Sequence, residues 1–110
     1  FLRKDGSYPS GHSAIGNGWG LVLASIIPER TTELVKRGRS YGDSRRICNV
    51  HWLSDTEEGR TLAAATFARL QSSPAYQADL EKARAELASA RAVPPSRDCA
   101  AEAAALALTP

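Results

Sequence analysis

The sequence contains no long apolar run and carries little net charge, and each shortage excludes a class of protein. Its best candidate for a membrane span, residues 21–27, is short and contains Ser25, whereas a spanning helix needs about 20 apolar residues. The net charge of +2 is too small to indicate a nucleic-acid-binding surface. We therefore expect a soluble chain with no membrane insertion and no nucleic-acid partner.

Cysteine is scarce and methionine is absent. The two cysteines, Cys48 and Cys99, permit one disulfide, but their spacing offers no zinc site. With 110 residues, of which 43% are hydrophobic and 24% charged, the chain has the size and composition of one globular domain.

Helical periodicity is the main pattern that the sequence does contain. After the turn-rich residues 1–9, apolar side chains recur every three or four positions up to Pro28, which predicts a helix with one apolar stripe. The stripe consists of Ile15, Trp19, Val22, Leu23, Ile26 and Ile27. Gly16, Gly18 and Gly20 each cost such a helix about 1 kcal/mol relative to alanine. They therefore indicate close contact with another helix or backbone, where a side chain would not fit.

Two further helices are predicted from the next part of the sequence. A basic helix covers residues 29–41, and Gly42 is expected to break it. Ser54 and Glu57 have the spacing of a capping box, which predicts that another helix begins there.

The last third of the sequence contains one more clear helix. Ser73 and Pro74 begin it, and the prolines at 94 and 95 stop it. The alanine-rich remainder after Cys99 forms either a short helix or a loose tail. No segment has the pattern of a strand, so the predicted fold class is all-α, a helical bundle.

Two short polar stretches carry both histidines of the chain. The first is Pro-Ser-Gly-His at residues 9–12, and the second runs from Ser44 to Asp55 with the sequence SRRICNVHWLSD. The residues between them, 13–43, are enough for one helix out and one helix back. Such a hairpin would return the second stretch to the first.

The residue types in these stretches suit phosphoryl transfer, in which negative charge spreads over three equatorial oxygens. Arg45 offers a planar fork of donors that matches those oxygens. Ser10 and the amide of Gly11 add neutral donors, and a helix that begins beside them directs its positive end toward an anion. The glycine would therefore let the backbone approach a phosphate.

The two histidines can divide the remaining chemistry. The carboxylate of Asp55, four residues after His51, can hold one ring nitrogen of His51 and leave the other free to attack phosphorus. His12, which arrives on a separate segment, would donate a proton to the leaving oxygen, and this favours slightly acidic conditions.

Each of these residues also has an ordinary structural explanation. A histidine four residues before an aspartate commonly forms a helix-face hydrogen bond. Ser10 could simply cap a helix, and Arg45 with Arg46 could form a solvated charged face. The glycines could serve helix packing alone. The occurrence of all these residue types in two compact stretches favours the chemical interpretation.

The combined pattern resembles that of the bacterial class A non-specific acid phosphatases, within the type 2 phosphatidic acid phosphatase and vanadium haloperoxidase superfamily. Their signature is a lysine followed after six residues by Arg-Pro, then Pro-Ser-Gly-His, then Ser-Arg-x5-His-x3-Asp. The second and third parts occur here at residues 9–12 and 44–55 with every spacing kept. The segments GSYPSGHSAIG, GDSRRICNVHW and SDTEEGR are similar to the class A enzymes in particular, and the likeness covers residues 1–92.

The resemblance implies a metal-independent hydrolase of small-molecule phosphomonoesters, without a cofactor, that is periplasmic or secreted. His51 would form a phosphohistidine intermediate, Asp55 would orient it, and His12 would be the general acid. The implied phosphate-binding residues are Ser10, Gly11, Ser44 and Arg45. Residues 1–93 would be the C-terminal catalytic part of the domain, with a partial core of the acid phosphatase and haloperoxidase fold. Residues 94–110 would be a tail, either flexible or a short helix.

One part of the signature is absent, because the family places its lysine and arginine upstream of Phe1. We therefore expect a fragment that is weakly active or inactive by itself, and whose incomplete helical core favours a homo-oligomer. Two other functions stay open, a non-catalytic helical fragment that binds phosphate and a relative of the vanadate-dependent haloperoxidases. Gly42-Asp43-Ser44 also resembles the nucleophile block of serine esterases. Those enzymes place an aspartate two residues ahead of the histidine, whereas here the histidine precedes the aspartate.

Overall fold

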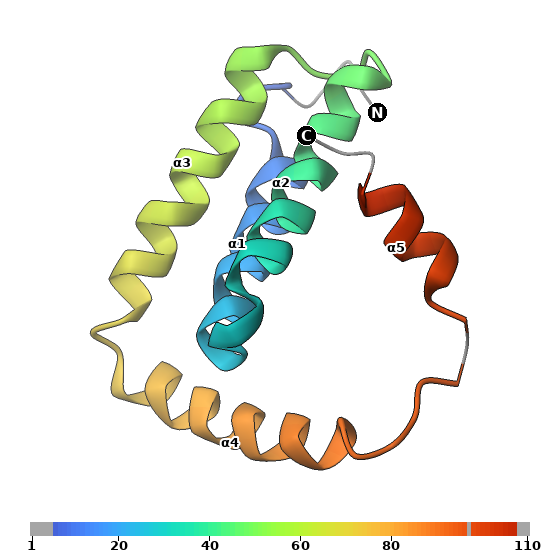
Figure 1. The fold of residues 1–110 in the computed structure, drawn as a ribbon. Helices are drawn as coiled ribbons and strands as arrows, with labels where there is room; N and C mark the ends of the chain where they lie inside the picture. The colour runs from blue at the N-terminus through green and yellow to red at the C-terminus, as the bar shows by residue number, and fades with distance from the viewer. Residues whose placement is uncertain (1–5, 97, 108–110) are drawn as a thin grey trace.

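The computed structural model describes residues 6–96 and 98–107, and within them the regular structure is entirely helical (Figure 1). The elements are α1 (Gly11–Ile26), the short 3₁₀ helix η1 (Pro28–Arg30), α2 (Thr31–Ile47), α3 (Leu53–Leu70), α4 (Pro74–Ala90) and α5 (Ala100–Ala107). The predicted all-α class is confirmed. Among these described helices, none combines the length and the apolar character that a membrane span requires.

Helices α1 and α2 form an antiparallel pair whose backbones touch. A Cβ atom added at Gly16 would lie 2.8 Å from the carbonyl oxygen of Gly38, and one at Gly20 would lie 2.9 Å from that of Leu34. Both distances are too short for a real side chain, so the predicted close contact is confirmed at Gly16 and Gly20. It is wrong for Gly18, where an added Cβ would meet only the side chain of Ala63, at an ordinary 3.9 Å.

The buried face of α1 is made of small residues and not of its apolar stripe. Ser13, Gly16 and Gly20 are buried, whereas Ile15 is 52% exposed and Trp19 is 70% exposed. The stripe predicted from the sequence therefore lies beside the helix contact. The reason is that two backbones in contact leave no room between them for large side chains.

Helix α2 passes through Gly42 without a break and ends at Ile47, so the prediction of a break at Gly42 is wrong. A Cβ atom at this position would lie 2.8 Å from Oγ of Ser13 on α1. The penalty of about 1 kcal/mol for glycine in a helix is small enough for packing to outweigh it.

After Ile47 the chain turns at Asn49, whose φ of 58° is a left-handed value that asparagine tolerates better than most residues. Cys48, in the same turn, is exposed and forms no disulfide with another described residue.

Helix α3 begins one residue before the predicted cap. Its first residue is Leu53, and the backbone N–H of Trp52 donates to a carboxylate oxygen of Asp55 at 3.1 Å. The predicted capping box of Ser54 and Glu57 is therefore wrong. The carboxylate that accepts the backbone N–H of the cap residue belongs to Asp55, the third residue of the helix, and not to Glu57.

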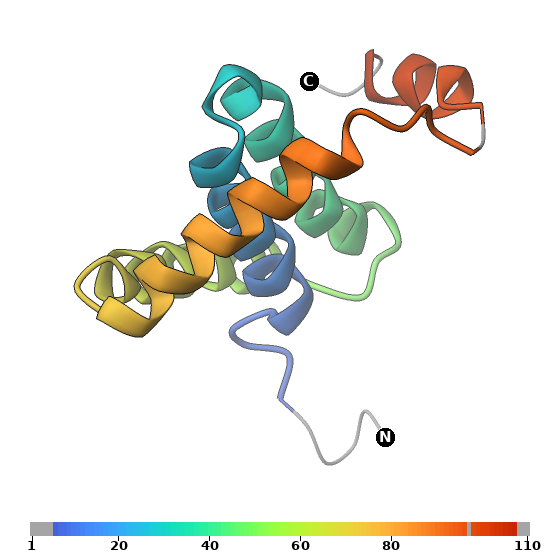
Figure 2. The same cartoon turned by 90° about the horizontal axis from the view of Figure 1, so that it is seen from below.

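The predicted start of α4 is confirmed, because Ser73 caps this helix and Pro74 is its first residue. The helix ends at Ala90, before it reaches the prolines that are predicted to stop it. Helix α4 crosses the end of the α1–α2 pair (Figures 1 and 2), where a guanidinium nitrogen of Arg84 donates to the carbonyl of Ser25 at 2.9 Å. Of the two alternatives for the alanine-rich end, the helix is correct, and it is α5. Arg37 of α2 forms an ion pair with Glu102 of α5 at 3.4 Å.

Candidate active site

Three helix ends meet at one end of the bundle, namely the start of α1, the end of α2 and the start of α3 (Figure 1). The backbone N–H of Ser10 donates to the carbonyl of Asp55 at 2.8 Å, which joins the first turns of α1 and α3. A Cβ atom at Gly59 would lie 2.5 Å from the carbonyl oxygen of Ser10, so these two helices also touch at the backbone. The predicted hairpin is therefore confirmed, and it brings the two polar stretches together.

His51 lies in the turn before α3 and is held by a buried carboxylate. Its Nδ1 is 3.2 Å from Oδ2 of Asp55, a residue that is only 3% exposed. The same oxygen accepts the N–H of Trp52, while the other oxygen is 3.4 Å from the hydroxyl of Ser54. Because the carboxylate occupies Nδ1, Nε2 is the ring nitrogen that this contact leaves available.

The environment of Asp55 lowers the pKa of its carboxyl group below the ordinary value. Burial raises this pKa, but hydrogen bonds from the Trp52 backbone and from the side chains of His51 and Ser7 together outweigh burial. The carboxylate therefore stays ionised in mild acid, where it can keep the His51 ring in one orientation.

This pKa shift predicts how Asp55→Asn changes stability with pH. A folded-state pKa below the unfolded value stabilises the native protein while the carboxyl is ionised, and the contribution disappears as pH falls through the folded-state pKa. We expect the variant to be less stable than the wild type at neutral pH, and the difference to shrink progressively below about pH 4. Urea unfolding at a series of pH values measures this difference. A gap that stays constant or widens toward low pH would contradict the assignment.

His12 is in the first turn of α1, is exposed, and faces the same space as His51. Their ring centroids are 6.4 Å apart, with an angle of 57° between the ring planes. The ring of Tyr41, near the end of α2, also lies close to His12, at 6.2 Å between ring centroids. Sequence reasoning missed Tyr41, because only the antiparallel pairing of α1 with α2 brings it to the histidine.

Arg45 is half-buried in the last turn of α2 and has an unsatisfied donor. Its Nε is buried and has no hydrogen-bond partner among the described residues. Its neighbour Arg46 is exposed and lies 3.8 Å from Asp43. An unpaired buried donor of this kind costs about 1–3 kcal/mol, and an anion at this end of α2 would remove that cost. The charged-face interpretation therefore describes Arg46 better than Arg45.

The other predicted phosphate ligands differ in how available they are. Gly11 is exposed at the first position of α1, where a helical N–H has no partner within the helix. Ser10 is fully buried, and its hydroxyl accepts the N–H of Ser13 at 3.2 Å as the cap of α1. The hydroxyl of Ser44 donates to the carbonyl of Tyr41 at 2.6 Å. Contact of either hydroxyl with an anion would require these bonds to rearrange.

In the described part of the chain, no three His, Cys, Asp or Glu side chains are grouped as metal ligands. The arrangement instead combines two imidazoles, a buried carboxylate, an unpaired guanidinium nitrogen and the N-terminus of α1. Such a set can bind an anion, attack it from one side and donate a proton from the other.

Comparisons with known proteins identify a family and several relatives. Residues 2–78 match the PAP2 superfamily. Over 86 residues the chain is 55% identical to the non-specific acid phosphatase of Salmonella typhimurium. This match covers 78% of this chain and 34% of that protein. It is 48% identical over 87 residues to the non-specific acid phosphatase of Providencia stuartii, and this match covers 79% of this chain and 35% of that protein. It is 42% identical over 90 residues to an acid phosphatase of Zymomonas mobilis, and this match covers 82% of this chain and 34% of that protein. The chain thus spans about a third of the length of these relatives.

Proposed function

The chain belongs to the PAP2 superfamily, and we propose that it supplies the nucleophile and the general acid of an acid phosphatase, a phosphomonoester hydrolase that works through a phosphohistidine. One observation carries the proposal. Asp55 holds His51 at 3.2 Å, and the ring centroid of His12 lies 6.4 Å from that of His51, near enough for both rings to serve one phosphoryl group. The proposed substrates are small-molecule phosphomonoesters, and the proposed location is the periplasm or the exterior.

In the proposed first step, Nε2 of His51 attacks phosphorus, so that a P–N bond forms while the bond to the leaving oxygen breaks. His12 gives its proton to that oxygen, which departs as an alcohol. In the second step a water molecule attacks the phosphohistidine, His12 takes a proton from the water, and the P–N bond breaks to release phosphate. Asp55 keeps Nδ1 protonated throughout and stabilises the positive charge that develops on the His51 ring. No metal or cofactor takes part in this scheme.

The proposed anion site lies between the start of α1 and the end of α2. The amide of Gly11 and the positive end of the α1 dipole stabilise the phosphoryl oxygens, and Arg45 pairs with them through its guanidinium. Ser10 and Ser44 remain predicted ligands of the same oxygens.

Arg45→Gln tests the anion site directly. We expect the dissociation constant for inorganic phosphate to rise by about 30-fold, since a charge-assisted contact contributes about 2 kcal/mol. The change is measured by titrating phosphate while following the ring resonances of the two histidines by NMR. Arg46→Gln is the matched control, because this neighbouring arginine is exposed and already lies near Asp43. Equal losses in both variants would indicate a general charge effect and contradict a specific role for Arg45.

Hydrolysis of p-nitrophenyl phosphate in mild acid, at about pH 5.5, tests the activity itself. Two alternatives have their own signatures. A non-catalytic phosphate-binding fragment would bind phosphate without turnover, and a haloperoxidase relative would oxidise bromide when supplied with vanadate and peroxide. The serine esterase alternative is less favoured, because Asp43 forms an ion pair with Arg60 and the hydroxyl of Ser44 donates to its own helix.

A further inference from the structure

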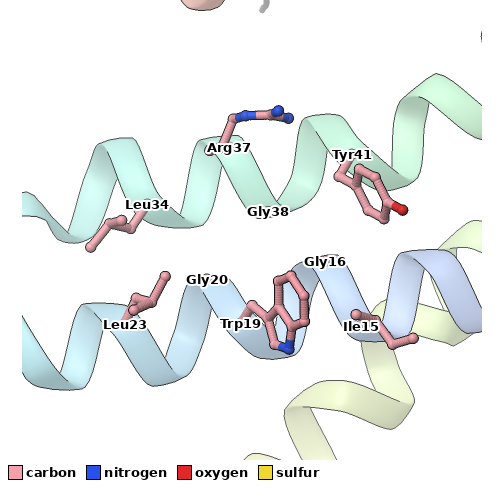
Figure 3. A pocket seen from close by; sticks show the side chains of 9 residues that line it. All are labelled: Ile15, Gly16, Trp19, Gly20, Leu23, Leu34, Arg37, Gly38 and Tyr41. Atoms are coloured by element: carbon pink, nitrogen blue, oxygen red, sulfur yellow. The ribbon is translucent and has the colours of Figure 1, made fainter. Parts of the chain in front are cut away.

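A groove that the proposed reaction steps do not use runs between α1 and α2. Its volume is about 330 Å³, and its walls include Ile15, Trp19, Leu23, Leu34 and Tyr41 (Figure 3). The close backbone contact of the two helices closes its base at Gly16, Gly20 and Gly38. A concave, mainly apolar cavity of this size is typical of sites for small molecules.

The groove begins beside the proposed general acid. Tyr41 lines the groove, and its ring centroid lies 6.2 Å from that of His12. Ile15 and Trp19 follow His12 by three and seven residues, so all three lie along one side of α1. In Figure 3, Ile15 and Tyr41 are at one end of the groove and Leu23 and Leu34 at the other, with Trp19 between them. The groove therefore leads from His12 along the helix pair.

In-line attack determines which part of a substrate lies on this side. When His51 attacks phosphorus, the leaving oxygen must be opposite, where His12 protonates it. The alcohol carried by that oxygen therefore lies on the His12 side of phosphorus. Tyr41, whose ring centroid is 6.2 Å from that of His12, lines the groove that begins there.

We propose that the α1–α2 groove is the leaving-group subsite, and that it favours phosphomonoesters of aromatic or other bulky apolar alcohols. This inference rests on the proposed phosphatase function. Trp19, which is 70% exposed, and Tyr41, which is 42% exposed, would cover the two sides of the apolar group.

The charges around the groove favour an apolar occupant over an anionic one. Among the described residues that line it, only Arg37 is charged. Its Nε lies 3.4 Å from Glu102 of α5, so its charge is already partly neutralised. A second phosphate or a carboxylate on the leaving group would therefore gain little here, whereas an aromatic ring would leave water for apolar walls.

Trp19→Ser tests the subsite with two alkyl phosphates whose leaving alcohols are similar in acidity, 2-phenylethyl phosphate and ethyl phosphate. We expect the wild type to prefer the phenylethyl ester in kcat/KM by about tenfold, and the variant to lose this preference, which is measured as the ratio of the two kcat/KM values. Leu62→Ser is the matched control, because Leu62 is an exposed apolar residue of α3 outside the groove. This control should keep the preference.

Each other outcome overturns the inference in a distinguishable way. If ethyl phosphate is hydrolysed in a His51-dependent manner but the phenylethyl preference is missing or survives in Trp19→Ser, the subsite is wrong and the phosphatase function stands. If neither ester is hydrolysed in a His51-dependent manner, the proposed function fails and the subsite fails with it. If sedimentation shows a dimer that Trp19→Ser dissociates without changing the preference, the groove is an interface between two copies.

Discussion

His51→Ala should lower the rate of p-nitrophenyl phosphate hydrolysis by at least about a thousandfold, because removing a nucleophile eliminates the covalent route completely. Among the described residues, neither Asp55 nor His12 is placed to take over this proposed role. Asp55 is 3% exposed and already engaged by the Trp52 backbone, and the ring of His12 is 6.4 Å away. Steady-state kinetics measure the loss, and acid-labile, base-stable phosphate on the protein after a rapid quench identifies the phosphohistidine. Phosphate release that the substitution leaves unchanged would refute the assignment.

His12→Ala is the informative companion variant, since it removes the other imidazole from the same site. A general acid matters most for a poor leaving group, so this variant should lose much more activity on ethyl phosphate than on p-nitrophenyl phosphate. His51→Ala should lose both activities together, because both substrates require the nucleophile. Equal sensitivity of the two substrates to His12→Ala would indicate that this residue binds the phosphoryl group without donating a proton.

Gly38→Ala should destabilise the folded chain by about 2 kcal/mol, although alanine is the better helix former. A Cβ atom at this position would overlap the carbonyl oxygen of Gly16 and lie 3.1 Å from its carbonyl carbon. These are backbone atoms, so the helices themselves must separate and lose part of their packing. The midpoint of urea unfolding, followed by circular dichroism, measures the change.

Gly18→Ala is the matched control for this prediction. The residue is also a helical glycine, but an added Cβ would meet only the side chain of Ala63, at 3.9 Å. We expect stabilisation by up to about 1 kcal/mol from the higher helix propensity of alanine. If both variants shifted stability in the same direction, helix propensity and not backbone contact would govern the α1–α2 pair.

Several features that sequence analysis predicted correctly depend on a short stretch of chain. The start of α4 follows from Ser73 and Pro74, because a capping hydroxyl and a proline at the first position act within one turn. The return of the second polar stretch to the first follows from the length of residues 13–43. Both are decided within a short segment of chain.

The errors arose where contacts between helices compete with local preference. Gly42 continues α2 because Ser13 of another helix lies where a side chain would be. The start of α3 is an exception with a local cause, because Asp55 accepts the N–H of Trp52 three residues earlier while also holding His51. A rule based on neighbouring residues predicts a break at Gly42, because it cannot take account of a side chain that belongs to another helix.

By itself the sequence determined the chemical groups of this protein and their order, namely His12 on one segment and Arg45, His51 and Asp55 on another. Only the tertiary structure decided what surrounds them. It uses the hydroxyl of Ser10 as a cap, leaves Nε of Arg45 without a hydrogen-bond partner among the described residues, and sets Tyr41 beside His12 at the mouth of an apolar groove. The physical reason is that these relations depend on three helix ends meeting through glycine contacts, and the distances across such contacts are not encoded in any single stretch of residues.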